Sequence, residues 1–117
     1  MAYALLILEP PGLRQARTEA QGRELYGRMV RFSEELRARG VLTLSQSLAS
    51  DRGGTRVRTQ GKQTVVVDGP FAEAREMVGG ILLLTCPTRE EATAIARACP
   101  AAQWATIEVR ELGPCFT

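Results

Sequence analysis

The chain has 117 residues, of which 44% are hydrophobic and 24% are charged, and its formal net charge is +2. These values are typical of one globular domain that buries a single core, and they leave no room for a second domain. Because arginine and glutamate alternate along the chain and form no basic block, the composition argues against a nucleic-acid-binding protein.

The residue types that are rare or missing narrow the chemistry further. The chain has no histidine, which excludes Ser-His and Cys-His nucleophilic catalysis and imidazole metal sites. The three cysteines match neither metal-binding pairs nor a redox Cys-x-x-Cys motif. Cys86 and Cys99 lie in apolar segments and are expected in the core, whereas Cys115 is expected to be exposed. We therefore expect no metal and no cofactor.

The first predicted element is a strand over residues 3–8, a continuous apolar run of the kind that is buried on both faces of a sheet. Glu9-Pro10-Pro11 ends this run early, and no basic region precedes it, so it resembles a strand rather than a signal peptide. No stretch approaches the length of a transmembrane helix. A cytoplasmic location and no membrane partner are expected by default.

A helix follows. Thr18 and Gln21 have the spacing of a capping box, and Gly40 is a suitable residue to end the helix. Between them, one apolar stripe recurs at helical spacing, made up of Leu25, Met29, Phe32 and Leu36. A strand is predicted over residues 41–48, and a hairpin over residues 55–59 and 63–67.

The second half of the chain repeats this order. The β-branched run of residues 64–67 stops at Asp68-Gly69-Pro70, and residues 72–78 are predicted to form a helical turn or a loop. Gly79-Gly80 then opens a strand over residues 81–86. A second capping box, which starts at Thr88, begins a helix that Pro100 ends, and a final strand is predicted over residues 104–110.

Two strand–helix–strand units around a hairpin predict an α+β, ferredoxin-like split βαβ fold. Its antiparallel sheet would carry two helices on one face and an inserted β-hairpin. Residues 3–8 and 81–86 are apolar at successive positions, which indicates that the second face of the sheet is buried too. Since nothing else in the chain could cover that face, we predict a homodimer packed through the sheet faces.

The chain resembles the DGPF branch of the YCII-related family over nearly its whole length, residues 1–117 as a single domain. The residues that carry the resemblance are Val65-Val66-Val67-Asp68-Gly69-Pro70-Phe71-Ala72-Glu73 and Gly79-Gly80, with supporting matches at Tyr3-Ala4-Leu5-Leu6-Ile7 and Val109-Arg110-Glu111-Leu112.

The resemblance implies a dimeric α+β barrel, a bacterial protein and an indirect link to extracytoplasmic-function sigma factors. Proteins of the YCII type are similar to small-molecule enzymes with a pocket built around a His–Asp pair. This chain departs from that pattern, since it has no histidine and carries Gln46 where the family often has an acidic residue.

Asp68 is the leading candidate for a functional residue, as a general base or a ligand hydrogen-bond acceptor at the end of a buried strand. Alternatively, it is a turn residue that caps its own loop amides, with Gly69 supplying a positive φ. Glu73 could pair with Asp68 as a second carboxylate, or be a solvated charge. Further candidate ligand-binding residues are Gln46, Tyr26 and Arg75.

The hairpin carries Arg56, Arg58 and Lys62, which favour a solvated edge over a nucleic-acid surface. Two functions remain open. The first is a small-ligand-binding dimer with an accessory or regulatory role. The second is a small-molecule enzyme of lyase or hydrolase type that uses Asp68 with Glu73, and the missing histidine makes us favour the first.

Overall fold

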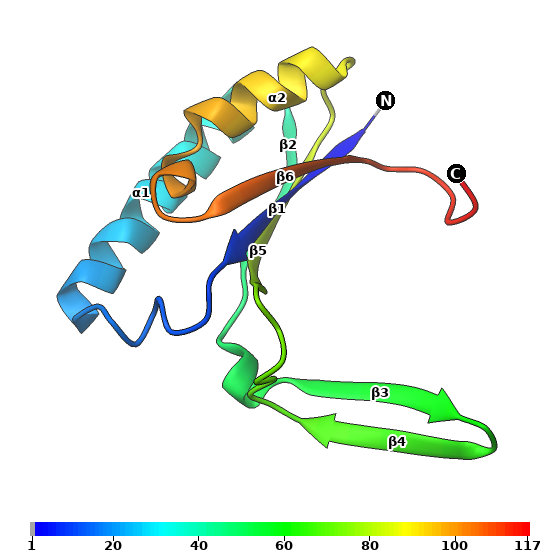
Figure 1. Cartoon of the computed structure of the whole chain (residues 1–117). Coiled ribbons are helices and arrows are strands. Elements are labelled where there is room, and N and C mark those ends of the chain that lie inside the picture. Colours follow the sequence, from blue (N-terminus) through cyan, green and yellow to red (C-terminus); the bar gives the residue numbers. More distant parts are fainter. Residues whose placement is uncertain (1) are drawn as a thin grey trace.

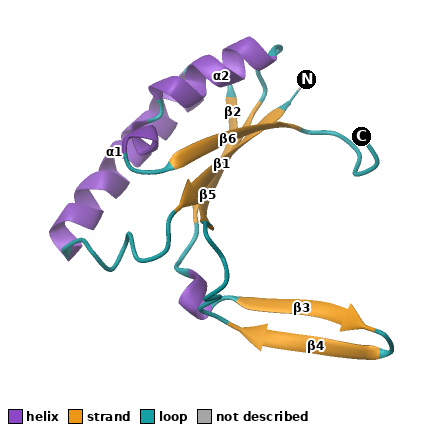
Figure 2. Ribbon diagram, in the orientation of Figure 1, coloured by secondary structure: helices purple, strands orange, loops and turns teal. Residues whose placement is uncertain are grey.

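A computed structural model describes residues 2–117. Two layers make up the main body: a four-stranded antiparallel sheet, and two helices that lie together on one of its faces (Figures 1 and 2). The elements are β1 (Tyr3–Glu9), α1 (Glu19–Ala38), β2 (Leu42–Ser47), β3 (Thr55–Gln60), β4 (Gln63–Asp68), β5 (Met77–Leu84), α2 (Arg89–Ala98) and β6 (Thr106–Glu111), with short 3-10 turns at Asp51–Gly53 and Pro100–Gln103.

The strand order β2-β5-β1-β6 is that of the ferredoxin-like fold, which confirms the predicted fold class. Strands β3 and β4 pair only with each other. They form a hairpin that projects away from the main body (Figure 1). The radius of gyration is 16.0 Å, whereas a compact domain of this length has one of about 13 Å. The projecting β3–β4 hairpin accounts for this elongated shape.

Local signals in the sequence begin and end helix α1 as predicted. The Thr18 hydroxyl accepts from the amide of Gln21 at 3.1 Å, and the Gln21 side chain accepts from the amide of Thr18 at 2.9 Å. At the other end, Gly40 has a φ of 75°, and the amide of Val41 donates to the carbonyl of Leu36. Together with the bond from the Gly40 amide to the Arg37 carbonyl, this is the Schellman pattern.

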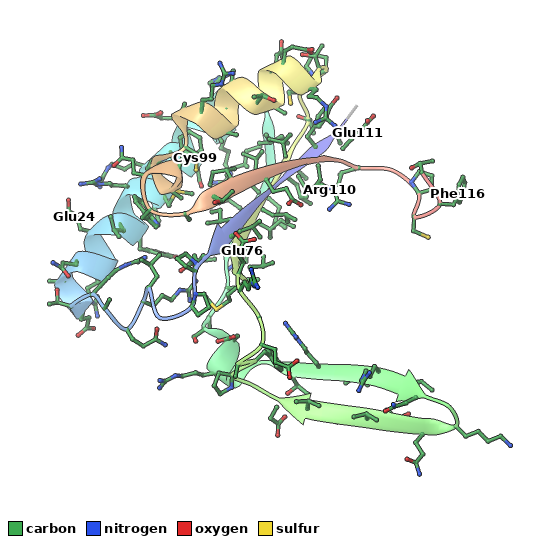
Figure 3. The ribbon with its side chains drawn as sticks, viewed as in Figure 1. Glu24, Glu76, Cys99, Arg110, Glu111 and Phe116 are labelled. Atoms are coloured by element: carbon green, nitrogen blue, oxygen red, sulfur yellow. The ribbon has the colours of Figure 1, made fainter. Side chains whose placement is uncertain are left out.

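The core lies between the sheet and the helices. Tyr3, Leu5 and Leu82 of the sheet pack there against Phe32 and Leu36 of the α1 stripe, and all five are buried. Side chains fill the space between the two layers (Figure 3), where Cys99 is also found. Cys86 and Cys99 are buried and Cys115 is exposed, as expected from their sequence contexts.

No helix of the described chain covers the second face of the sheet (Figure 1). Residues opposite one another on paired strands share a face, so this face carries Leu6 opposite Ile81, and Ala4 opposite Leu83. At its margins Leu44 and Val78 are 41% and 42% exposed. The face is therefore apolar and uncovered in the single chain, as the continuous apolar runs predicted.

Strand β5 begins at Met77, four residues before the predicted strand, and includes both glycines. The pairing register with β1 shifts between Ile7 and Leu8, because Ile7 faces Gly80 while Leu8 faces Val78. Gly79 is thus the extra residue of a β-bulge. Of the two alternatives predicted for residues 72–78, the loop is correct for residues 72–76, which are turns and loop, and residues 77–78 already belong to β5.

Candidate functional site

A cavity of about 870 Å³ lies between α1 and the helix-covered face of the sheet. Its volume falls within the range of about 300–1,000 Å³ that is usual for small-molecule sites. Ile7, Gly80 and Leu82 form the sheet side, and Tyr26 and Met29 belong to the helix side. Charged side chains from the segment between β1 and α1 and from α1 itself also line it.

A buried ion pair lies where β1 ends. Glu9 is 5% exposed, and its two carboxylate oxygens accept from Nη2 and Nε of Arg14 at 2.8 and 3.0 Å. The same guanidinium donates to the carbonyl of Leu48 at 2.8 Å and to that of Gly79 at 3.3 Å. Arg14 therefore ties the chain after β1 to the ends of β2 and β5.

The bulge glycine makes this ion pair possible. A Cβ atom at Gly79 would collide with the Glu9 carboxylate and lie 2.9 Å from Nη2 of Arg14. The missing side chain thus leaves the space that the carboxylate occupies. Neither Glu9 nor Arg14 was a candidate from the sequence. The available signal was an acidic residue that directly follows a buried apolar strand.

Arg17 lines the cavity just before α1 begins. Its Nη2 atom is buried and makes no hydrogen bond to any residue that the structure describes. An arginine is always charged at physiological pH, so a buried N–H without an acceptor is costly. No acceptor among the described residues satisfies this atom, although Arg17 lines the cavity.

The polar groups between α1 and β2 come from two serines. The hydroxyls of Ser33, which is 7% exposed, and Ser45 are 2.7 Å apart and form a hydrogen bond. Each hydroxyl can also accept or donate one further bond, so a bound molecule could share this pair. Trp104 adds an aromatic side chain to the lining.

Two of the residues singled out from the sequence line this cavity. Tyr26 of α1 is 59% exposed, which places it at the mouth. Gln46 of β2 belongs to the lining too, but it is opposite Ile81, so its exposed side chain lies on the uncovered face of the sheet, and its amide donates to the carbonyl of Ser47 at 3.4 Å.

The other three candidates lie elsewhere. Asp68 ends β4, is exposed, and accepts a hydrogen bond from the Thr55 hydroxyl at 3.1 Å. Glu73 and Arg75 are exposed in the loop before β5. None of the three lines this cavity or the smaller one beside the Asp68–Phe71 loop, and within the described residues no hydrogen bond joins Asp68 to Glu73.

The Asp68-Gly69-Pro70-Phe71 loop is held by a different aspartate. Asp51 Oδ2 accepts from the amide of Phe71 at 3.5 Å, and the guanidinium of Arg56 lies 4.0 Å from the centre of the Phe71 ring. The predicted positive φ at Gly69 is wrong, because within the described residues only Gly12, Gly40 and Gly61 have one. Gly69 is required instead because a Cβ there would collide with the Asp51 carbonyl oxygen.

This loop lines a second cavity of about 290 Å³, together with Asp51 and Met77. Glu9 and Arg14 line both cavities, so their ion pair lies between the two. Within the described chain, no group of three histidine, cysteine, aspartate or glutamate side chains could hold a metal ion. Burial raises the pKa of the Cys86 and Cys99 thiols, both in the core.

Comparisons with known proteins support the fold and the family. The chain is 27% identical over 97 residues to an uncharacterized protein, R00369, of Rhizobium meliloti (strain 1021), which covers 83% of this chain and 78% of that protein. None of the helices that the structure describes could span a membrane.

Among solved structures, the fold is similar to that of 5-chloro-2-hydroxyhydroquinone dehydrochlorinase (TftG) from Burkholderia phenoliruptrix AC1100, in complex with 2,5-dihydroxybenzoquinone. The TM-score is 0.56 at 18% sequence identity, covering 97% of this chain and 94% of that one. At this identity the likeness shows the fold alone, the ferredoxin-like α+β fold. The sequence model of the YCII-related domain matches residues 1–115, and the chain belongs to that family.

Proposed function

We propose that this protein binds a small organic molecule in the cavity between α1 and the sheet. The observation that carries the proposal is the cavity itself, about 870 Å³ in volume and lined by both polar and apolar side chains. Such a mixture orients a ligand through a few polar contacts while apolar walls remove it from water. TftG, which shares the fold, was solved with a small quinone bound, and this agrees with a small-molecule role.

The protein acts as a homodimer in this proposal, with the uncovered sheet faces packed together. The support is the apolar face that carries Leu6, Ile81 and Leu83, each only partly exposed. A dimer of this kind buries apolar surface that would otherwise contact water. Sedimentation equilibrium at micromolar concentration tests it, and a compact monomer would refute it. An accessory or regulatory role, with an indirect link to extracytoplasmic-function sigma factors, and a cytoplasmic location rest on the family resemblance and stay predictions.

Gly22 offers a direct test of the binding site. It lines the cavity from α1, and a Cβ atom built on it meets nothing within 4 Å. The backbone at Gly22 therefore tolerates a side chain, and the ring of Gly22→Phe should take up space in the cavity, whereas Gly22→Ala leaves the cavity open. We expect compounds from a metabolite screen, with 2,5-dihydroxybenzoquinone included, to raise the melting temperature of wild type and Gly22→Ala only. Equal stabilisation of Gly22→Phe, or no stabilising compound, would refute the proposal.

A second candidate function is a small-molecule enzyme of lyase or hydrolase type that uses Asp68 with Glu73. The dehydrochlorinase activity of TftG favours it. Chloride release from 5-chloro-2-hydroxyhydroquinone by wild type, lost in Asp68→Asn without loss of fold, would support this candidate. Release that is undiminished in Asp68→Asn would exclude Asp68 as its catalytic residue.

A further inference from the structure

We propose that the cavity takes a small organic anion built on a planar ring, and that Arg17 receives its negative charge. This inference rests on the proposed function, because it names the class of ligand for the same cavity. It is argued from the charges along the cavity wall, from the unpaired guanidinium atom of Arg17, and from the side chains that would surround the rest of the ligand.

Four arginines and three glutamates line the cavity. Arg14 is neutralised by the buried carboxylate of Glu9, with both oxygens engaged. Arg23 is neutralised by Glu19, one helical turn before it, at 2.9 Å. Each of these two pairs has a net charge of zero, so neither contributes to the net charge that a ligand meets. The Glu19–Arg23 pair is also exposed, and water screens its charges.

Three charged side chains of the wall are left. Glu34 and Arg37 are exposed on α1 and carry opposite charges, so they cancel in the sum. The remaining charge is that of Arg17, and the cavity wall as a whole carries one excess positive charge. A wall with this charge selects a monoanion over a neutral molecule or a cation.

Arg17 is also placed to make the contact. Its Nη2 atom is buried and has no acceptor within the described chain. A guanidinium matches the two oxygens of a carboxylate in a fork of parallel hydrogen bonds. The residue lies next to Thr18, the N-cap of the 20-residue helix α1, whose N-terminal end adds partial positive charge. Because Nη2 has almost no accessible surface, the guanidinium turns toward the cavity when it binds an anion, and the anion then satisfies the N–H that the protein leaves unpaired.

The other side chains that line the cavity indicate the shape and the polar groups of the ligand. Trp104, Met29 and Tyr26 offer aromatic and polarizable surfaces, which suit a planar ring. The Ser33–Ser45 hydroxyl pair offers a second polar contact for a hydroxyl or carbonyl group. The combination favours a hydroxylated aromatic carboxylate.

Calorimetry with matched probes tests the inference. The probes are hydroxylated benzoates, which are anions at neutral pH, and the corresponding neutral benzamides. Wild type should bind the acids about 10- to 100-fold more tightly than the amides, the value of one charge-assisted hydrogen bond. Arg17→Gln should lose this preference, and Arg17→Lys should keep part of it. Arg28→Gln, which removes an arginine of α1 that pairs with Glu24 and does not line the cavity, should change the preference by less than about 2-fold.

The melting temperature of the ligand-free protein separates recognition from a structural role. Because Arg17 Nη2 has no partner, Arg17→Gln should melt no lower than wild type. A clearly lower melting temperature would indicate a structural role for Arg17 and refute the assignment.

Three other results would also overturn it. Equal binding of acids and amides would refute the anion assignment but leave the proposed function intact. An equal loss in Arg28→Gln would refute the role of Arg17. Failure of every probe to bind would refute the ligand class, and the proposed function would fail with it only if the metabolite screen found no ligand either.

Discussion

Replacement of Gly79 by alanine should be strongly destabilising, although glycine in a strand is normally a weak point. The new Cβ would occupy the position of the Glu9 carboxylate and crowd Nη2 of Arg14. The carboxylate would have to leave its buried site, and the arginine would lose its partner. Breaking a buried ion pair costs about 3–5 kcal/mol. Since the Arg14 side chain is 28% exposed, we expect a loss of about 3 kcal/mol, or about 12 °C in melting temperature for a chain of this length.

A double-mutant cycle shows whether the collision is the cause. Glu9→Ala removes the carboxylate and so makes room for the Cβ, and the cost of Gly79→Ala in that background should fall by about 2 kcal/mol. Gly80→Ala is the matched control, because its Cβ would only come within 3.3 Å of Gln46 and Ile7, a mild overpacking of about 1 kcal/mol. Urea unfolding followed by circular dichroism measures each value. Strictly additive effects of the two mutations would refute the reasoning.

Four further predictions concern the helix, the thiols and the loop. Gly22→Ala should raise stability by about 0.5–1 kcal/mol, because it lies inside α1 with open space around it; a lower melting temperature would contradict this. Cys115 should react with a thiol reagent at once at pH 7, while Cys86 and Cys99 react only on unfolding. Burial raises the pKa of both core thiols, so they favour folding fully below about pH 8.5 and less as pH rises above it; stability that increases above pH 9 would show the sign to be wrong. Asp51→Ala should speed amide exchange in the loop that Asp51 caps and cost about 1 kcal/mol, and unchanged exchange would show that the bond is unimportant.

The elements of the fold were predictable because each has a local cause. Thr18 and Gln21 bond to one another across one helical turn, and Gly40 adopts its positive φ next to the helix that it ends. The apolar runs of β1 and β5 likewise predict strands that are buried on both faces of the sheet. In the single chain, the helices cover one face of this sheet and the other face is open. Such signals act over a few residues, so they can be identified in the sequence.

The site was harder to predict because its parts are far apart in the chain. Tyr26 and Gln46 were candidates and do belong to the lining of the main cavity, but the sequence offered no reason to place them at the same cavity as Arg17. Asp51 holds the loop that follows Asp68 by accepting a hydrogen bond from the amide of Phe71, which is twenty residues away in the chain. The two groups stand on either side of the β3–β4 hairpin, and they meet because its strands pair.

The Asp68–Glu73 stretch illustrates the division between the two kinds of information. The sequence alone determined that a strand ends there, that a tight loop follows, and that a second strand–helix–strand unit repeats the first, since propensity and capping are local. Only the tertiary structure decided that Gly69 is needed for contact with Asp51, that Gly79 makes room for Glu9, and that the main cavity opens beside α1. Those outcomes depend on side-chain packing between distant segments, which no local pattern in the sequence encodes.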